Sequence, residues 1–334
     1  MIKKLAGLTS VAALAAATMT GTAFAAGHLE EITVAYFLEW PMPFQYAKEM
    51  GTYEEALGVD INWVAFDTGT AMSAAMASGD VHLSVSQGLP PFVVATSAGQ
   101  DLQVLDVAVS YSENDNCVVA SGLGIDKTNA TELEGKRVAL PIGTAAHYGF
   151  LVQMEHFGVD ITSMEIVDMP PAEGQTAFSQ GNLDMVCGWG GALRRMMEDG
   201  NSLLTGAEKE ELGILVFDAT TAPSAFVAEN PDLVSAFLKV TADANDMWNS
   251  GENTDEMIAV IAKDAGMSEE DTKTTMDTFV FPSAEDQLSD KWLGGGVADF
   301  MAGAAKVFQD AGSIPNIRDD YSSAVNAEPL SAIN

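Results

Sequence analysis

The sequence predicts an α/β fold of two lobes with mostly parallel sheets. Short apolar runs typical of strands alternate with longer amphipathic stretches typical of helices, and the connections between them are short. A chain of 334 residues, of which 47% are hydrophobic, is long and apolar enough for two packed cores. No internal repeat, low-complexity tract or long linker is visible. The natural interpretation is two similar lobes, the first of which is completed by the C-terminal helices.

The first part of the chain repeats the order strand, turn and helix. The expected strands are the apolar runs at 32–37, 61–66 and 81–85. The expected helices cover 44–57, a stretch that opens at 67–70 and ends at 78, and a stretch that opens at 86–91 and ends near 98. Pro90 and Pro91 suit the first turn of the last helix, because the N–H groups that proline lacks have no partner there.

A second block begins near Asn116. Its expected strands are 117–120, 137–140, 165–168, 184–187 and 214–217. Residues 141–144 open a helix that ends at Phe157, followed by Gly158 as a capping glycine. From Pro231 onward the pattern is almost purely helical, with amphipathic stretches at 232–248, 254–265, 269–278 and 290–311. We therefore assign 26–113 and 219–334 to the first lobe and 114–218 to the second.

Residues 1–25 carry the features of a secretory signal peptide. Lys3 and Lys4 form the charged start, an Ala-rich stretch follows, and 23–25 is a small-x-small cleavage site. No later run of 18 apolar residues is present, and no cysteine stands at the cleavage point where a lipid anchor would be attached. The mature chain is therefore expected to start at Ala26 and to reside in the periplasm or outside the cell.

The charge balance excludes several classes of function. The chain has 15 Lys plus Arg against 48 Asp plus Glu, a net charge of −33, and it offers no basic stripe for a nucleic-acid backbone. The four histidines and two cysteines are scattered, so neither structural zinc nor an iron–sulfur cluster is expected. We interpret the acidic excess as an adaptation to high ionic strength, where screening limits self-repulsion.

Three strand-to-helix turns are candidate anion sites. In open parallel sheets, ligands bind beyond the carboxyl ends of the strands, and the turns at 67–70, 86–90 and 143–148 lie there. Each places Gly, Ser or Thr before a helix, whose free N–H groups favour an anion, although ordinary capping explains any one turn equally well. No Lys or Arg lies in these turns, which suits a compact monoanion such as a sulfonate better than a phosphate. Thr144, His147 and Tyr148 add side-chain donors.

Tryptophans and carboxylates occupy other expected strand ends. Trp40 follows the first strand, Trp189 follows 184–187, and Asp218 follows 214–217, while Glu39 precedes Trp40. An aromatic face beside a carboxylate can hold an ammonium group. The alternatives are that each tryptophan belongs to the core, that Asp218 only ends a strand, and that Glu39 is an exposed loop residue.

Motifs for catalysis are missing from this sequence. No Ser/His/Asp arrangement, Walker loop or Gly-x-Gly-x-x-Gly follows a strand, so His147 is interpreted as a hydrogen-bond donor and no cofactor is expected. Cys117 and Cys187 could pair in an oxidising compartment. Both lie within apolar strand runs, however, and buried free thiols are the favoured interpretation.

Taken together, these motifs resemble the periplasmic taurine-binding proteins, the solute-binding components of sulfonate-type ABC importers. The similarity covers nearly the whole mature chain. It is carried by residues 34–36, 66–69, 77–81 and 135–141, the pair His147-Tyr148, residues 181–184 before Trp189, Asp218, and residues 319–321. Individually these motifs are short, but their order and spacing together are fairly specific.

The resemblance implies a type II periplasmic binding protein, in which two α/β lobes joined by a hinge close on the ligand like a Venus flytrap. It implies a monomer without enzymatic activity that hands its ligand to the membrane permease of an ABC transporter. The sulfonate would meet two turns, and the remaining contacts would come from single side chains. Ser86, Gln87 and Gly88 form the first turn, Thr144, His147 and Tyr148 form the second, Asp218 takes the ammonium, and Trp189 walls the pocket.

Two departures from the enterobacterial pattern concern the ligand. That pattern has Gly-Ser-Ser-Pro where this chain has residues 87–90, and it has small residues where this chain has Glu39 and Trp40. Backbone N–H groups and the Gln87 amide would then replace hydroxyl donors. Glu39 and Trp40 are the residues expected to alter the ligand.

Two alternatives stay open. The same fold could bind an alkanesulfonate, hypotaurine, nitrate or a pyrimidine precursor, and an uncharged or purely anionic ligand would not touch Asp218. An enzyme on this scaffold, as in thiamin-pyrimidine synthesis, would be expected to show a Cys-rich iron-binding motif and a cytosolic address.

Overall fold

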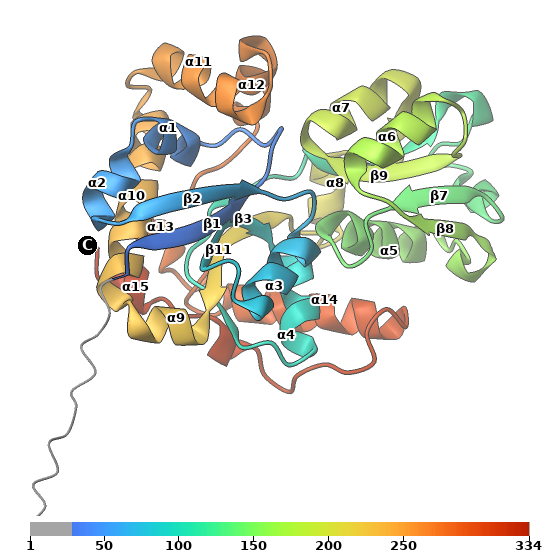
Figure 1. Cartoon of the computed structure of the whole chain (residues 1–334). Coiled ribbons are helices and arrows are strands. Elements are labelled where there is room, and N and C mark those ends of the chain that lie inside the picture. Colours follow the sequence, from blue (N-terminus) through green and yellow to red (C-terminus); the bar gives the residue numbers. More distant parts are fainter. Residues whose placement is uncertain (1–28, 334) are drawn as a thin grey trace, which may run out of the picture.

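Two β-sheets flanked by helices form the framework of the chain in a computed structural model, which describes residues 29–333 (Figure 1). The expected signal peptide at 1–25 lies outside the described residues. No helix in the described range is long and apolar enough to cross a membrane. The predicted α/β class with two sheets is confirmed.

The first sheet has the strand order β2-β1-β3-β11-β4, with β5 also paired to β11. Its parallel strands are β1 (Glu31–Tyr36), β2 (Asp60–Ala65) and β3 (Leu83–Gly88). Antiparallel pairs join β11 (Phe217–Pro223) to β3, to β4 (Leu102–Val104) and to β5 (Val109–Ser110). The chain thus leaves this sheet after β5 and returns to it in β11.

The second sheet has the order β10-β6-β9-β7-β8. Its parallel strands are β7 (Arg137–Leu140), β8 (Glu165–Asp168) and β9 (Met185–Trp189). Its antiparallel strands are β6 (Asp115–Ala120), which pairs with β9, and β10 (Gly200–Ser202), which pairs with β6. The chain crosses from the first sheet to the second between β5 and β6 and returns between β10 and β11. All four of these strands pair antiparallel with a neighbour. We propose that the two sheets define the two lobes, with the first boundary as expected from the sequence and the second moved to before Phe217, where β11 of the first sheet begins.

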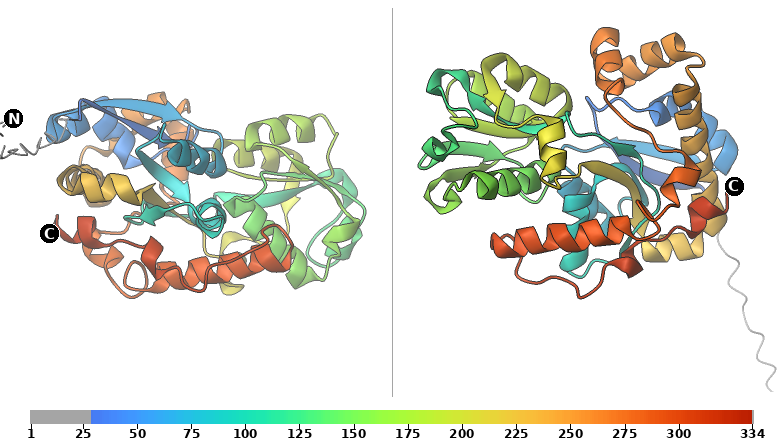
Figure 2. Two further views of the ribbon diagram at one scale, coloured as in Figure 1. Left: turned by 60° about the horizontal axis from the view of Figure 1, so that its bottom comes forward. Right: turned by 180° about the vertical axis from the view of Figure 1, so that it is seen from behind.

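Helices cover both sheets (Figure 2). Those of the second sheet are α5 (Ala145–Phe157), α6 (Pro171–Ser179), α7 (Gly190–Asp199) and α8 (Gly206–Glu211). Those that begin between strands of the first sheet are α1 (Pro43–Glu49), α2 (Thr52–Leu57), α3 (Gly69–Ser78) and α4 (Leu89–Ser97). The helices after β11 are α9 (Ser224–Glu229), α10 (Pro231–Ser250), α11 (Thr254–Ala265), α12 (Glu269–Met276), α13 (Ala284–Gln287), α14 (Gly296–Asp310) and α15 (Glu328–Ser331). α10 packs against α1 and α2, and α14 contacts both α4 and α5.

Two predicted helices differ in the structure. The helix expected at 44–57 is split into α1 and α2, because Gly51 between them has φ of 69°, a left-handed conformation that interrupts a helix. The helix expected from 290 begins only at Gly296, after a series of turns that includes Gly294 and Gly295. In both places the apolar pattern is helical, but glycine favours a turn.

Two predicted strand ends also differ. The strand expected to end at 85 continues to Gly88, so 86–88 is strand backbone that pairs with β11 and not a turn. The strand expected at 214–217 is displaced to β11, so Asp218 lies near the start of a strand and not after its end. Ile214 and Val216 are buried although they lie outside any strand, and an apolar run of that length cannot distinguish the two cases.

Cys117 and Cys187 form a disulfide, so the favoured interpretation of buried free thiols was wrong. The two residues are direct cross-strand partners in the antiparallel pair β6 and β9. Two residues away in the same register, Asp115 lies opposite Trp189. The sequence pattern predicted mostly parallel strands, so it did not predict the antiparallel pair that places the two cysteines opposite each other. The register of that pair is set by contacts between segments that are distant in the sequence.

Candidate functional site

A small cavity of about 20 Å³ lies between the two sheets. This is room for about one water molecule, well below the range for small-molecule sites, about 300–1,000 Å³. Its lining comes from both sheets and from the segments that join them. The lining residues are Phe37, Trp40, Gly69, Gly88, Pro91, Tyr111, Asp115, Thr144, Ala145, Trp189 and Asp218.

Four helices begin at this cavity. Gly69 is the first residue of α3, Gly88 precedes α4, Thr144 precedes α5, and Trp189 precedes α7. The first N–H groups of a helix lack helical partners and carry the positive end of its dipole, so they attract anions. No Lys or Arg belongs to the lining. An anion bound here would be held by neutral dipoles, as the turns in the sequence predicted.

Glycine at position 69 allows two of these helices to approach each other. A Cβ atom on Gly69 would lie 2.7 Å from Cγ of Pro91 in the first turn of α4. Any other residue at 69 would push α3 away from α4. The two helix N-termini therefore reach the cavity together because this position has no side chain.

Asp218 is a buried carboxylate in the cavity wall, only 1% exposed. It accepts a hydrogen bond from the Tyr111 hydroxyl and one of 2.7 Å from Ser86 Oγ, which itself accepts one of 2.8 Å from Trp40 Nε1. Burial raises the pKa of Asp218 to about 7, although the hydrogen bonds from Tyr111 and Ser86 act in the opposite direction. Ser86 is fully buried beneath the cavity, so its role is to orient Asp218 and Trp40.

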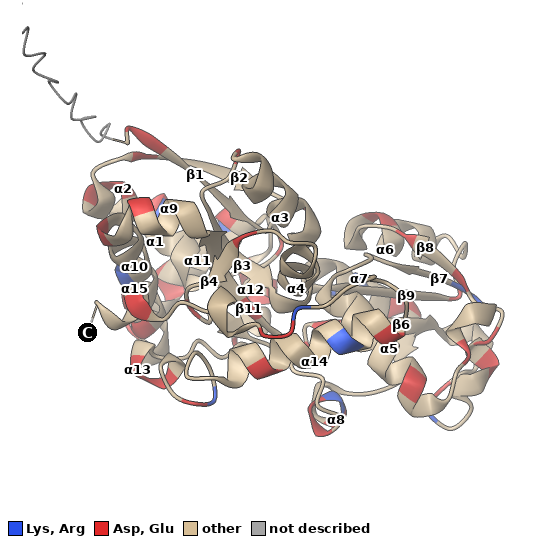
Figure 3. Cartoon of the chain, turned by 90° about the horizontal axis from the view of Figure 1, so that it is seen from below, with Lys and Arg blue, Asp and Glu red and all other residues tan. Residues whose placement is uncertain are grey.

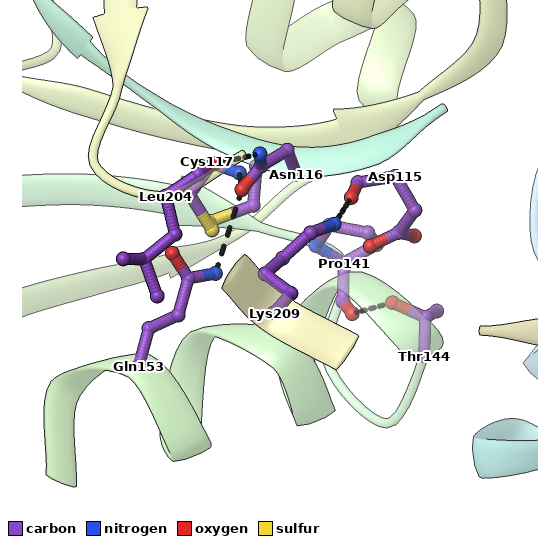
Figure 4. The surroundings of a disulfide bond; sticks show 9 residues. Asp115, Asn116, Cys117, Pro141, Thr144, Gln153, Leu204 and Lys209 are labelled. Atoms are coloured by element: carbon purple, nitrogen blue, oxygen red, sulfur yellow. Dashed lines mark hydrogen bonds between the residues drawn. A yellow bond between two sulfur atoms is a disulfide. The ribbon is translucent and has the colours of Figure 1, made fainter. Parts of the chain in front are cut away.

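Asp115 is a second buried carboxylate in the same wall, which the sequence analysis missed. It is the first residue of β6 and 3% exposed, and its Oδ2 has no hydrogen-bond partner within residues 29–333. The buried Lys209 ammonium donates to the backbone oxygen of Asp115 (Figure 4) and to that of Ser112. Burial raises the pKa of Asp115 to about 7, partly opposed by the charge of Lys209. An acidic residue just before a buried strand was the available signal.

Aromatic rings form the remaining walls. Trp40 and Tyr111 meet edge to face with centroids 4.6 Å apart, and Phe37 lies 6.0 Å from Trp189. Trp40 is also packed against Phe279 at 4.7 Å, so it belongs to the core as well as to the cavity. Phe37 and Tyr111 were not predicted as site residues. Aromatic faces beside carboxylates attract cationic groups.

Gln87 does not line the cavity, contrary to the sequence-based expectation. Its amide nitrogen donates to Gly69 O and Ser73 Oγ, and its amide oxygen accepts from Thr221 Oγ1 at 2.6 Å. Because β3 continues through this residue, the Gln87 side chain points to the opposite face from those of its neighbours. The side chain connects β3, α3 and β11 inside the first lobe.

His147 and Tyr148 also lie outside the lining. Nδ1 of His147 accepts from the Gly143 N–H at 3.0 Å, so it is not a donor there, and burial lowers the pKa of its ring to about 4. Tyr148 packs against Phe300 and Phe308 of α14. Both side chains connect α5 to α14, while Thr144 and Ala145 at the start of α5 face the cavity. The Thr144 hydroxyl donates to Pro141 O at 2.7 Å.

Glu39 lines a neighbouring hollow and not the cavity itself. That hollow is lined by Glu39 together with Phe37, Trp189 and the start of α6. The Glu39 carboxylate pairs with Arg195 of α7 at 3.0 Å, so it connects the first lobe to the second. Of the ten predicted ligand contacts, the structure thus brings five to the cavity: Trp40, Gly88, Thr144, Trp189 and Asp218.

A two-lobed α/β fold with a small polar cavity between its sheets is that of a periplasmic binding protein. The chain belongs to the family described as NMT1/THI5 like, whose profile matches residues 41–250. It is 26% identical over 300 residues to the taurine-binding periplasmic protein of Escherichia coli (strain K12), covering 89% of this chain and 91% of that protein.

Solved structures share the fold. The periplasmic aliphatic sulphonate binding protein SsuA from Escherichia coli has a TM-score of 0.69 at 22% identity, over 87% of this chain and 91% of that one. The alkanesulfonate-binding protein SsuA from Xanthomonas axonopodis pv. citri bound to MOPS has a TM-score of 0.72 at 20% identity, over 90% and 100%. The desulfurization enzyme DSZB has a TM-score of 0.58 at 14% identity, over 90% and 98%.

Proposed function

We propose that this chain is a periplasmic solute-binding protein that delivers taurine, or a closely related zwitterionic sulfonate, to an ABC importer. The observation that carries the proposal is the buried Asp218 carboxylate in a cavity onto which four helix N-termini open. A ligand with an anionic and a cationic end matches both features at once. The similarity to a taurine-binding periplasmic protein over most of both chains supports the same ligand class.

Each end of such a ligand has a matching part of the cavity. The sulfonate suits the N-termini of α3, α5 and α7, which supply N–H groups but no formal charge. The first turn of α4 adds its dipole but few N–H donors, because Pro90 and Pro91 have none. The ammonium suits Asp218 between the faces of Trp40 and Tyr111. The small size of the cavity limits the ligand to a small molecule.

An alkanesulfonate without an ammonium group is the second candidate, because structures of sulfonate-binding relatives share the fold. The carboxylates of Asp218 and Asp115 count against it, since an anion beside two buried acids raises the cost of their charge. For an enzymatic role like that of DSZB we find no support in the cavity: both cysteines of the sequence form the disulfide, so neither offers a thiol.

The proposed location is the periplasm and the proposed partner is the permease of an ABC transporter, with the chain acting as a monomer. The signal-peptide features of residues 1–25 support export. The disulfide supports an oxidising compartment, where such bonds persist.

A thermal-shift panel on the purified mature protein tests the proposal. Taurine, hypotaurine, ethanesulfonate, nitrate, glycine betaine and sulfate are compared. A ligand at about 1,000 times its dissociation constant stabilises the folded state by about 4 kcal/mol, which moves the melting temperature by several degrees. A shift with taurine and little with ethanesulfonate is the expected result. A shift with ethanesulfonate alone, or with none of these compounds, would contradict it.

A further inference from the structure

Asp115 has the properties of a ligand contact that is still without its partner. Its side chain is almost fully buried, it lines the cavity, and Oδ2 receives no hydrogen bond. A buried carboxylate oxygen without a donor is strongly unfavourable, because burial removes its hydration and returns nothing. Asp218, by contrast, receives two hydroxyl donors. The two carboxylates of this cavity therefore differ in the hydrogen bonds that they receive from the protein.

The charged and titratable groups around Asp115 do not supply the missing donor. Lys209 of α8 lies close, but its ammonium donates to two backbone oxygens. Tyr111 donates to Asp218, whose own charge repels that of Asp115. In Figure 4 the Asp115 carboxylate lies on the same side of Lys209 as Thr144, which lines the cavity, while the disulfide lies on the other side. Asp115 therefore lies on the cavity side of Lys209, and its Oδ2 atom is shielded from solvent.

The two carboxylates come from different lobes. Asp115 begins β6 of the second sheet, and Asp218 lies in β11 of the first. Burial raises the pKa of the Tyr111 hydroxyl between them, and the charge of each acid raises it further. The charge of Asp115 also acts on Asp218, so the two acids repel one another across the cavity. Without a cation, bringing the lobes together brings two like charges together.

We propose that Asp115 is a second, specificity-determining contact for the ligand's ammonium group, so that one primary ammonium bridges Asp115 and Asp218 and joins the two lobes. This inference rests on the proposed function and names the part of the ligand that the site requires. A primary ammonium has three N–H donors and can serve both acids, whereas a quaternary ammonium has none. A ligand with only a sulfonate leaves the two carboxylates facing each other uncompensated.

The test compares Asp115→Asn with a matched control, Asp168→Asn, by titration calorimetry. Asp168 lies in the same lobe at the end of β8 and accepts the Ile142 N–H at 2.9 Å, a bond that asparagine retains, and it does not line the cavity. The probes are taurine, ethanesulfonate, ethanolamine and β-alanine. We expect Asp115→Asn to weaken taurine binding at least about tenfold and Asp168→Asn to change it less than about twofold.

The outcomes separate this inference from the proposed function. If taurine binds and Asp115→Asn leaves its affinity unchanged, the inference is overturned and the proposed function stands. If ethanolamine or β-alanine binds as well as taurine and Asp115→Asn weakens both, the inference stands and the preference for a sulfonate fails. If no ammonium compound binds, both are overturned.

A measurement on the unaltered protein covers the case in which Asp115→Asn does not fold. Taurine is compared with its N-methyl and N,N,N-trimethyl derivatives. We expect affinity to fall with methylation, by at least about tenfold for the trimethyl compound, because it cannot donate to either carboxylate. Equal affinity for taurine and the trimethyl compound would overturn the inference, since attraction to aromatic faces alone would then explain binding.

Discussion

Asp218 is a carboxylate that is buried and can still pair with a cationic group of a ligand. Two hydroxyl groups hydrogen-bond to it, yet neither is charged, so its charge stays uncompensated until a cation arrives. The Trp40 indole completes a chain from the aromatic wall through Ser86 to this carboxylate. The rigidity of that chain fixes the position where a positive group binds most favourably.

Replacing Asp218 with Asn is expected to weaken taurine binding more than tenfold, because a hydrogen bond to a charged group contributes about 1.5–3 kcal/mol. Thr144→Ala is expected to lose only about 0.5–1.5 kcal/mol, since the backbone donors of α5 remain. Titration calorimetry on both variants measures the order. A larger loss for Thr144→Ala would reverse this assignment of roles.

The same acids make the stability of the ligand-free protein depend on pH. In the folded state the pKa of Asp115 and of Asp218 is about 7, against 3.8 for an ordinary aspartate. Between these values the folded protein holds protons that the unfolded chain has released, so these two groups lower stability as pH rises from about 4 to about 7. Below that window both states are protonated, and above it the loss is complete.

Asp218→Asn removes one of these titrations. Its melting temperature relative to that of the unaltered protein is expected to rise by a few degrees between pH 4 and pH 8, measured without ligand. The contribution of the surface acids to the pH dependence cancels in this difference, because both proteins have the same surface acids. A difference that is constant over this range would show that Asp218 is not held protonated by burial.

At the scale of elements, the disulfide joins β6 to β9 beside the cavity. Cys117 and Cys187 are cross-strand partners. Two residues further towards the cavity, Asp115 is paired with Trp189. β6 is the first strand after the chain crosses from the first sheet, and β9 lies in the interior of the second sheet. The disulfide therefore fixes the segment that follows the crossing to the second lobe. It therefore holds two cavity residues from distant parts of the sequence in one register.

Replacing Cys117 and Cys187 together with Ala is expected to destabilise the protein by about 4 kcal/mol, the chain-entropy value for a loop closed over 70 residues. Urea unfolding of the variant and of the oxidised protein measures the difference. Intact mass after alkylation under denaturing conditions confirms the oxidised state. If both proteins unfold at the same urea concentration, the bond does not stabilise the native state.

At the scale of the whole molecule, acidic residues are spread over both lobes and basic ones are few (Figure 3). Two of the arginines connect the lobes. Arg195 pairs with Glu39 at 3.0 Å and Arg194 with Asp271 of α12 at 3.1 Å, so neighbouring residues of α7 hold two segments of the first lobe. All four side chains are partly exposed, so each pair contributes little by itself.

A net charge of −33 predicts that salt stabilises this protein. Molar sodium chloride reduces the screening length to about 3 Å, which suppresses repulsion among the surface acids. We expect a melting temperature several degrees higher in molar salt than in dilute buffer, and potassium chloride should act equally. Equal stability in both media would contradict the interpretation of the charge as an adaptation to high ionic strength.

Half of the contacts proposed from local sequence patterns line the cavity, and the patterns missed residues in and beside the crossing between the sheets. Thr144 was found because helix starts carry local signals. Gly88 and Asp218 also line the cavity, although the strand ends from which they were chosen lie elsewhere in the structure. Gln87 was misplaced because its strand continues three residues beyond the expected end at 85. Tyr111 lies in the crossing between the sheets and Asp115 is the first residue of β6, two residues before the predicted strand, so no periodic pattern marked which of these side chains face inward.

The sequence by itself determined the α/β class, the order of most strands and helices, the excess of acidic charge and the presence of helix N-termini without basic residues. These properties follow from periodicity and composition, which act over a few residues. Only the tertiary structure decided that Cys117 pairs with Cys187 and that Asp115 and Asp218, about a hundred residues apart in the sequence, share one cavity. Those relations depend on strand pairing between distant segments, and neither segment carries the register in its own residues.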